Sequence, residues 1–361
     1  MAASDIPKTA RAAVISSFKE DLTLKDDFPV VQPSELKPGQ CLVKIEYAGC
    51  CHSDLHIRDD DWGLGSRLKL PLVGGHEGIG RVVAIGEHTV GNGVKLGDRV
   101  GLKWFGNACL RCEMCRTGWE TCCDVARAST HGCMIHGTFA DYALSYTDYA
   151  TPIPDGLDAA EATPLLCAGL TIYKAIKQTN AKAGEWIAIT GAGGGLGHLG
   201  VQFAVHKGLR VIAIDSGEDK KELCLKLGAE KWIDFQKSEN LVQDVIAAAD
   251  GEGPQAAVIA VGNARPFNDA LGYIRRTGTI VAVGMPVATA TLNIPIGLLI
   301  HKCCNIVGSA TGTQQEMIEI LRLAKAGKVR CQVEVKPLGE INNVMQDLSK
   351  GNIKGRVVLK M

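Results

Sequence analysis

The sequence has no excess of charge of either sign, because 39 Lys and Arg residues balance 39 Asp and Glu residues. A protein that acts mainly on nucleic acid or on an anionic membrane surface needs a positive field, and a balanced composition does not supply one. The chain also lacks the low hydrophobicity of a disordered protein, since 46% of its residues are apolar and 22% are charged. The expected partner is therefore a small molecule.

The sequence starts without the cationic stretch, apolar run and cleavage site of a secretory signal. We therefore expect a cytoplasmic, reducing location, where clustered cysteines are more often metal ligands or catalytic groups than disulfides. Two uncharged stretches, 186–205 and 277–300, approach the length of a membrane span. Glycines interrupt the first and Pro286 and Pro295 the second, so both fit buried strand-turn-helix segments better.

The length of 361 residues predicts two domains, at about 150 residues each. The first 150 residues read as glycine-punctuated β structure without a long helix, followed by a helical segment at 165–177. Short aliphatic runs then alternate with helical stretches, which predicts a parallel sheet covered by helices on both faces, the doubly wound α/β architecture. The expected strands of this series are 186–190, 210–215, 231–235, 256–261 and 279–284.

The tail adds a strand-like run at 305–310, helical stretches at 314–326 and 338–350, and a last strand at 355–360. We assign this tail to the N-terminal region. The expected domains are 1–166 plus 306–361 for the β-rich part, with a cysteine-rich lobe at about 104–125, and 167–305 for the parallel-sheet part.

A glycine cluster, Gly191-Ala-Gly-Gly-Gly-Leu-Gly197, follows the first strand of the series and opens a helix. Glycines at such a turn let backbone amides and a helix N-terminus approach a pyrophosphate closely. Asp215 ends the next strand, where a carboxylate can accept hydrogen bonds from an adenosine ribose. We interpret Gly194, Gly195 and Gly197 as the working glycines; a glycine-rich turn without a ligand is the alternative.

Four cysteines follow the spacing Cys109-x2-Cys112-x2-Cys115-x7-Cys123. Four thiolates on one short lobe suffice for a closed tetrahedral zinc site, which leaves no open coordination position and is therefore structural. Redox chemistry or an iron-sulfur cluster is the rival interpretation. Cys122 could replace Cys123 without violating any local rule.

A third set is scattered along the chain: Cys51-His-Ser-Asp-Leu-His56, then Gly75-His-Glu-Gly78, then Cys167. Spacing alone does not bring these residues together, and a buried cysteine or histidine is most often part of the core.

These segments, in this order, resemble zinc-dependent medium-chain alcohol dehydrogenases, the yeast and fungal type most closely. The resemblance covers almost the whole chain and implies a GroES-like catalytic domain followed by a Rossmann domain. The matching motifs are Cys-His-Ser-Asp-Leu-His at 51–56, Pro-Leu-Val-Gly-Gly-His-Glu-Gly at 71–78, Leu-Cys-Ala-Gly-Leu-Thr-Ile-Tyr-Lys-Ala at 166–175, Gly-Gly-Leu-Gly at 194–197, Val-Gly-Met-Pro at 283–286 and Gly-Arg-Val-Val at 355–358.

The resemblance implies two zinc ions per chain. A catalytic zinc would be held by Cys51, His76 and Cys167, with a fourth position left for water or substrate. Asp54 would orient His76, and Glu77 would lie behind the metal. The zinc would act as a Lewis acid while hydride passes from the alcohol to NAD.

The resemblance also assigns roles around the cofactor and the substrate. Ser53 would bond the alcohol oxygen, and His56 would pass its proton to water. Lys220 would bind the adenosine ribose, Thr171 the nicotinamide, and Leu196 would pack behind that ring. His52 and Arg356 match pyrophosphate contacts, and Trp62, Trp104 and Met285 match pocket walls, although three large apolar side chains could equally be core.

The chain departs from the yeast pattern at three positions. Ser53 replaces a threonine, which keeps the hydroxyl and loosens the size preference; Gly193 is expected to be sterically harmless; His198 adds a candidate cation near the phosphates. No insertion follows Cys123, which resembles the tetrameric branch, so a homotetramer is expected.

The interpretation is thus an NAD-dependent zinc alcohol dehydrogenase acting on primary, and in part secondary, alcohols. The closest rival is an NADP-dependent cinnamyl-type alcohol dehydrogenase, which Asp215 disfavours because a carboxylate repels a 2′-phosphate. A second rival is an inactive zinc-stabilised binding protein of the same fold.

Overall fold

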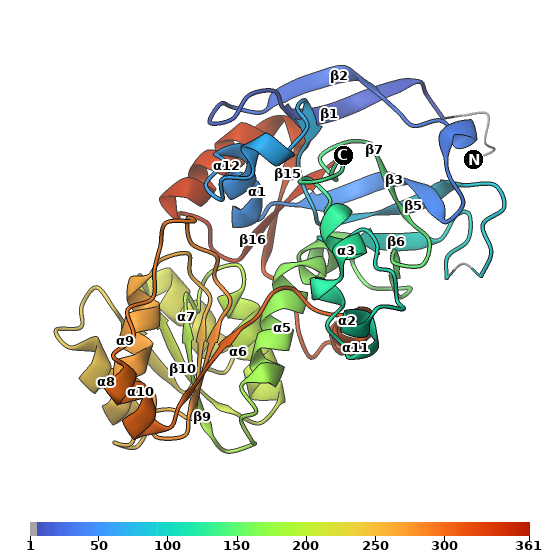
Figure 1. Cartoon of the computed structure of the whole chain (residues 1–361). Coiled ribbons are helices and arrows are strands. Elements are labelled where there is room, and N and C mark those ends of the chain that lie inside the picture. Colours follow the sequence, from blue (N-terminus) through green and yellow to red (C-terminus); the bar gives the residue numbers. More distant parts are fainter. Residues whose placement is uncertain (1–5, 92) are drawn as a thin grey trace. The chain divides into compact units, whose positions relative to one another are not determined.

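The computed structural model describes residues 6–91 and 93–361, and the chain forms two compact units (Figure 1). The first unit comprises the residues up to Cys167 together with 312–325 and 333–361. The second comprises 168–311 and 326–332. It therefore includes 326–332, which the sequence assigned to the other unit, and its main segment runs to 311 rather than to the expected 305. The reason is that the strand at 305–308 pairs within the parallel sheet of the second unit.

The first unit is built on a seven-stranded sheet in which β3 is central and pairs antiparallel with β5, β7 and β16. Apolar residues of β3 and β5, such as Val43, Ile45 and Val82, are buried in its core. The strands are β3 (Gln40–Gly49), β5 (Gly78–Ile85), β6 (Arg99–Leu102), β7 (Tyr142–Tyr146), β8 (Thr151–Pro152), β15 (Val333–Pro337) and β16 (Arg356–Lys360).

A three-stranded antiparallel sheet, in the order β2, β1, β4, adds to the same core. Its strands are β1 (Thr9–Ile15), β2 (Thr23–Pro29) and β4 (Leu72–Val73). The helices of this unit are α1 (His52–Arg58), α2 (Glu113–Arg116), α3 (Asp124–Ala128), α4 (Ala159–Ala162), α11 (Gln314–Lys325) and α12 (Ile341–Lys350). Helix α12 inserts Ile341, Val344 and Met345 into the core at the spacing of one helix face.

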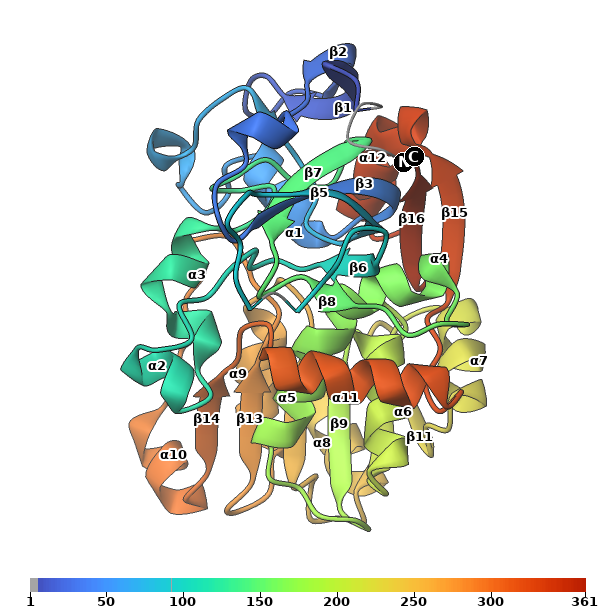
Figure 2. The same ribbon diagram turned by 90° about the vertical axis from the view of Figure 1, so that its right-hand side faces the viewer.

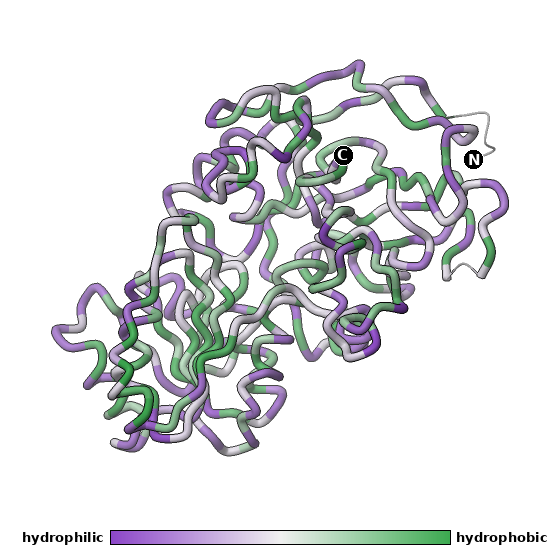
Figure 3. The backbone as a smooth tube through the Cα atoms, in the orientation of Figure 1, coloured by the Kyte–Doolittle hydropathy of each residue, from purple (hydrophilic) through white to green (hydrophobic). Residues whose placement is uncertain are grey.

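The second unit contains a six-stranded parallel sheet in the order β11, β10, β9, β12, β13, β14 (Figure 2). All five residues of β9 are buried, as a strand covered on both faces requires. The backbone coloured by residue hydropathy shows the same apolar centre of the sheet (Figure 3). The strands are β9 (Trp186–Thr190), β10 (Arg210–Asp215), β11 (Lys231–Asp234), β12 (Ala256–Ile259), β13 (Thr279–Ala282) and β14 (Asn305–Gly308).

Helices cover both faces of this sheet, with α5 and α6 on one side and α8 and α9 on the other (Figure 1). Val245 of α8 and Leu271 of α9 pack against the strands in one apolar cluster. The helices are α5 (Ala168–Gln178), α6 (Gly197–His206), α7 (Glu218–Lys226), α8 (Leu241–Ala248), α9 (Arg265–Tyr273) and α10 (Ile296–Lys302).

The strand order reverses next to β9, because the chain runs from β9 through β10 to β11 and then returns to β12 on the other side. Ligands of open α/β sheets bind beyond the carboxyl ends of the strands at such a point. The glycine cluster begins there, directly after Thr190. Among the described residues, no helix has the length and apolar character needed to cross a membrane.

Candidate active site

The scattered cysteines and histidine of the sequence meet in the first unit. One ligand atom each of Cys51, His76, Glu77 and Cys167 lies within 4.8 Å of the others, and all four residues are buried. Each residue stands just before or at the start of a secondary-structure element. Cys51 caps α1, the pair at 76–77 precedes β5, and Cys167 precedes α5. The fold thus joins three junctions that lie far apart in the sequence.

Asp54 ties two of these junctions together. Its Oδ2 accepts a hydrogen bond of 2.9 Å from the backbone N–H of Cys51, and its Oδ1 lies 2.8 Å from Nδ1 of His76. Because a carboxylate only accepts, Nδ1 of His76 carries the proton and Nε2 is left as the ligating nitrogen. That Nε2 lies 3.3 Å from Sγ of Cys167. The orientation expected from Asp54 is therefore built into the first turn of α1.

The site favours a thiolate at Cys51 and a protonated thiol at Cys167. A hydrogen bond from Cys167 lowers the pKa of the Cys51 thiol well below its ordinary value, and the same contact raises the pKa of Cys167. Burial opposes a charge on His76, but the charge of Asp54 and its hydrogen bond outweigh it and raise the pKa of the ring. On binding zinc, Cys167 would lose its thiol proton and His76 its Nε2 proton, while Nδ1 keeps the proton that it donates to Asp54. The two sulfurs and the nitrogen would then form a donor set that fits a zinc ion with one open position.

Glu77 and Arg356 form a buried ion pair beside these ligands. Burial raises the pKa of Glu77 to about 7, against the opposing charge of Arg356. Arg356 Nε and Glu77 Oε2 are buried and have no hydrogen-bond partner among the described residues. The resemblance assigns the Arg356 guanidinium to pyrophosphate binding. In the structure this guanidinium pairs with Glu77, and only its Nε has no partner among the described residues.

Aromatic and hydroxyl side chains surround the cluster. The ring of Trp104 meets the ring of His76 edge to face at 4.8 Å between centroids, and Trp62 lies 6.3 Å from Trp104. Ser53 Oγ lies 3.8 Å from Sγ of Cys51. These positions bring the expected hydroxyl and two expected pocket walls beside the candidate ligands.

Helix α1 also carries both further histidines of the motif. His52 is exposed, whereas His56 is buried, and their ring centroids lie 4.9 Å apart. The ring of His56 lies 5.3 Å from that of Trp62, and its Nδ1 lies 2.7 Å from Oδ2 of Asp61. Sequence reasoning missed Asp61, because it is one of three consecutive aspartates and nothing in the pattern distinguishes them.

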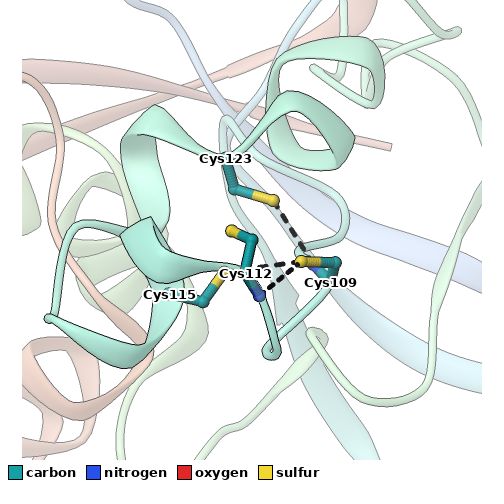
Figure 4. Close-up of side chains that lie close together, drawn as sticks. All are labelled: Cys109, Cys112, Cys115 and Cys123. Atoms are coloured by element: carbon teal, nitrogen blue, oxygen red, sulfur yellow. Dashed lines mark hydrogen bonds between the residues drawn. The ribbon is translucent and has the colours of Figure 1, made fainter.

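The four lobe cysteines converge as their spacing predicted (Figure 4). The sulfurs of Cys109 and Cys115 are 3.9 Å apart, and the backbone N–H of Cys112 donates to Cys109 Sγ at 3.3 Å. Backbone donors, that of Arg111 first, lower the pKa of Cys109 to about 6. Cys122 is exposed and lies outside the cluster, so Cys123 is the fourth candidate ligand. Four converging sulfurs fit a closed structural zinc site.

A buried lysine connects this lobe to the rest of the unit, a feature the sequence did not reveal. Nζ of Lys103 lies 2.7 Å from each of three acceptors, the Tyr149 carbonyl, Thr151 Oγ1 and Gln314 Oε1. The Tyr149 hydroxyl in turn donates to Glu120, within the lobe, at 2.8 Å. Burial lowers the pKa of Lys103 to about 7. The lobe is therefore held by polar contacts as well as by its sulfurs.

The second unit carries the candidate nucleotide site. Asp215 Oδ2 accepts from the backbone N–H of Gly193 at 2.9 Å, so the carboxylate holds the glycine turn against β10. Lys220 Nζ lies 3.4 Å from Asp215 Oδ1. A Cβ at Gly193 would lie 2.5 Å from that of Lys220. The glycine at this position therefore leaves room for the Lys220 side chain, which a larger residue would displace.

The remaining glycines lie as expected at the turn into α6. A Cβ at Gly197 would lie 2.0 Å from the carbonyl oxygen of Gly191, so only glycine allows this approach. Gly194 and Gly195 precede Leu196, the residue before α6. Thr171 is buried in α5, and Met285 belongs to this unit with 58% of its surface exposed.

His198 is not a cation aimed at a phosphate. It is fully buried, its Nδ1 lies 2.9 Å from the carbonyl oxygen of Gly194, and its Nε2 accepts from the backbone N–H of Gln332 at 3.2 Å. A ring that donates at one nitrogen and accepts at the other is neutral. His198 therefore bridges the glycine turn to the segment 326–332, and the sequence-based interpretation is wrong.

Known proteins resemble the chain in both units. Residues 37–155 match the family model of the alcohol dehydrogenase GroES-like domain, and residues 195–326 that of the zinc-binding dehydrogenases. Over 357 residues the sequence is 40% identical to alcohol dehydrogenase 1 of Emericella nidulans, with 99% of each protein aligned.

Solved structures give the same result. The alcohol dehydrogenase of Aeropyrum pernix superposes with a TM-score of 0.88 at 30% identity, over 97% of this chain and all of that one. The acetophenone reductase of Geotrichum candidum, solved in complex with NAD, superposes with a TM-score of 0.85 at 29% identity, over 99% and 98% of the two chains.

Proposed function

Because this chain belongs to the zinc-binding medium-chain alcohol dehydrogenases, and so is an oxidoreductase of alcohols, we propose that it transfers hydride between primary alcohols and NAD. Secondary alcohols are a further substrate class, and the products are aldehydes or ketones. The observation that carries the proposal is the Cys51, His76 and Cys167 cluster with Asp54 fixing the imidazole. An inactive binding protein of the same fold would not need such an oriented donor set.

The chain would bind two zinc ions. The four-cysteine lobe would hold one for structure, and the buried set of two cysteines and one histidine would hold the other for chemistry. When bound, the second zinc would polarise the alcohol oxygen and the nicotinamide would accept the hydride. Glu77 and Arg356 together place no net charge behind this donor set when both are ionised.

The chain's own residues handle position and proton. Ser53 would accept the hydrogen bond of the alcohol hydroxyl, and His56, one helical turn further along α1, would take the proton onward. Trp62 and Trp104 would exclude water from the reacting carbon. Met285 would form a third wall of the substrate pocket.

NAD is proposed over NADP because Asp215 ends β10 beside the glycine turn, where its charge repels a 2′-phosphate. Lys220, Thr171, Leu196 and His52 would make the cofactor contacts that the resemblance implies. Arg356 is paired with Glu77 and would offer only its unpaired Nε to the pyrophosphate. The acetophenone reductase that binds NAD supports the same choice.

We also propose a homotetramer in the cytoplasm. Strand β14 is an edge of the parallel sheet, and α10 beside it has no buried residue, with Ile296 and Ile300 70% and 68% exposed. Apolar surface next to a sheet edge favours association with another copy. Reduced thiols are needed at both cysteine clusters, which favours the cytoplasm. Light scattering of the purified protein tests the oligomer.

A kinetic panel tests the function. Purified protein is assayed with primary and secondary alcohols, with the corresponding carbonyls, and with NAD and NADP, while bound zinc is counted. We expect turnover of primary alcohols, a higher kcat/KM with NAD, and two zinc ions per chain. Preference for NADP with aromatic alcohols would favour the cinnamyl-type alternative, and zinc binding without turnover would favour the binding protein.

A further inference from the structure

We propose that Asp61 is a positioning residue of this reaction, whose carboxylate holds the His56 imidazole ready to take up a proton at Nε2. The inference rests on the proposed function, because it concerns the proton released when an alcohol is oxidised. Its basis is the 2.7 Å contact between Asp61 Oδ2 and His56 Nδ1.

The structure distinguishes Asp61 from its two neighbours. Asp59 pairs with Arg58 at 2.8 Å, and Asp60 accepts from the backbone N–H of Gly65 at 2.8 Å. Asp61 reaches the imidazole because its backbone N–H donates to the carbonyl oxygen of His56 at 3.0 Å, which folds the chain back over the end of α1. Three equal side chains in sequence thus have three separate partners.

This carboxylate lies at an electrostatically unfavourable place. The C-terminal end of a helix carries partial negative charge, so an acidic side chain beside it is stabilised by a cationic or hydrogen-donating partner. His56 is that partner. As a carboxylate only accepts hydrogen bonds, the neutral ring must carry its proton on Nδ1.

The other nitrogen is therefore a free acceptor. Nε2 of His56 is buried and has no hydrogen-bond partner among the described residues. Buried polar atoms in native proteins almost always have a partner, so this nitrogen is open to a hydroxyl group or a water molecule in the working enzyme. Ser53 precedes His56 by three residues and shares its face of α1. A proton passed on from the substrate hydroxyl can therefore arrive at Nε2.

Proton and charge balance follow. Oxidation of the alcohol transfers a hydride to the nicotinamide, which is reduced, and releases one proton, which Nε2 takes. The ring becomes an imidazolium, and the Asp61 carboxylate supplies the opposite charge that a buried cation needs. The Asp61 side chain is 32% exposed, so the Nδ1 proton can pass through its carboxylate to water. This loss leaves the ring neutral but protonated on Nε2, and proton exchange with water must return it to the Nδ1 form before the next turnover.

The test is Asp61→Asn, which removes the charge and keeps the shape. Asp59→Asn is the matched control, since it removes the same charge two residues away without contact to His56. Hydride transfer is measured in a single turnover by cofactor absorbance, so that product release does not mask it. We expect Asp61→Asn to slow alcohol oxidation about tenfold or more at neutral pH, and Asp59→Asn to keep the wild-type rate.

A double-mutant cycle separates positioning from folding. In a His56→Ala background, Asp61→Asn should cause no further loss, because its partner is already absent. An equal loss in both backgrounds, or no loss in either, overturns the role of Asp61. If His56→Ala itself leaves the rate unchanged, the proposed proton path fails with it.

Ring nitrogen chemical shifts of ¹⁵N-histidine protein give a readout independent of activity. The His56 signals, identified by their loss in His56→Ala, should show a proton on Nδ1 in the wild type and in Asp59→Asn. A neutral His56 ring protonated on Nε2 in the wild type would also overturn the inference.

Discussion

Replacing His198 with alanine should destabilise the second unit rather than remove a contact to the cofactor. The ring has no exposed surface and joins the Gly194 carbonyl to the backbone N–H of Gln332. Each lost buried hydrogen bond costs about 1 kcal/mol, and the cavity left by the ring adds a similar or larger amount. The free energy of unfolding should therefore fall by about 3 kcal/mol. For a unit of this size that corresponds to a fall in Tm of about 6–12 °C.

The assay is thermal unfolding of the protein without cofactor, followed by titration with NADH at room temperature. His206→Ala is the control, because His206 lies exposed at the end of the same helix, α6. We expect a large fall in Tm for His198→Ala and none for His206→Ala. The loss of NADH affinity in His198→Ala should be smaller than the loss expected when an ion pair to a phosphate is removed. An unchanged Tm with a large loss of NADH affinity would refute this reasoning and restore the interpretation of His198 as a phosphate-binding cation.

Three further predictions follow from the two cysteine clusters, the glycine turn and a buried histidine. Cys112→Ala should lower Tm and solubility, because three sulfurs hold the lobe poorly, whereas Cys167→Ala should abolish turnover with a milder effect on folding; metal analysis should find two zinc ions in the wild type and one in each variant, and a single zinc in active wild type would contradict one site. Asp215→Gly should weaken NAD binding and lower the preference for NAD over NADP, measured as the ratio of kcat/KM with NAD to kcat/KM with NADP. If the wild type used NADP equally well, the role given to Asp215 would be wrong. Burial lowers the pKa of His131 from 6.5 to about 4, so the unfolded chain binds a proton that the folded chain refuses, and stability falls as pH drops from 6.5 to 4. The fall is about 3 kcal/mol, and denaturant titrations of His131→Gln should show a flatter dependence over this interval, whereas equal slopes would contradict the assignment.

The sequence predicted the second unit closely. Strands expected at 186–190 and 210–215 are β9 and β10 with the same bounds, because buried parallel strands are short, apolar and bounded by turn residues. Helix starts shifted by a few residues, as at 165, where the first residues form a 3-10 helix that ends at Leu166. The family and the fold class are also confirmed by the comparisons.

Side-chain partners were less predictable. Spacing predicted the lobe cluster, since its cysteines lie within one short segment, but it left the choice between Cys122 and Cys123 to the structure. It did not reveal that Lys103 binds Gln314 or that Asp61 binds His56. The first contact joins residues from distant parts of the chain, and the second depends on how three residues turn after a helix. Neither contact has a signature in local hydrophobic periodicity.

His198 was misinterpreted because its partner at Gln332 is also distant in the sequence. A histidine next to a phosphate-binding turn looks like a ligand in sequence, because its charge is attractive there and its neighbours are small. In the structure the return of the chain at Gln332 supplies a donor that occupies Nε2, while Gly194 occupies Nδ1. Once both nitrogens are used in neutral form, none is left for an anion. Asp54 was expected beside His76 only through the resemblance, since the two residues are 22 positions apart, and its bond to the backbone N–H of Cys51 in its own helical turn was not predicted. Local spacing therefore predicts clusters within one short segment, whereas contacts between distant segments need the family pattern or the structure.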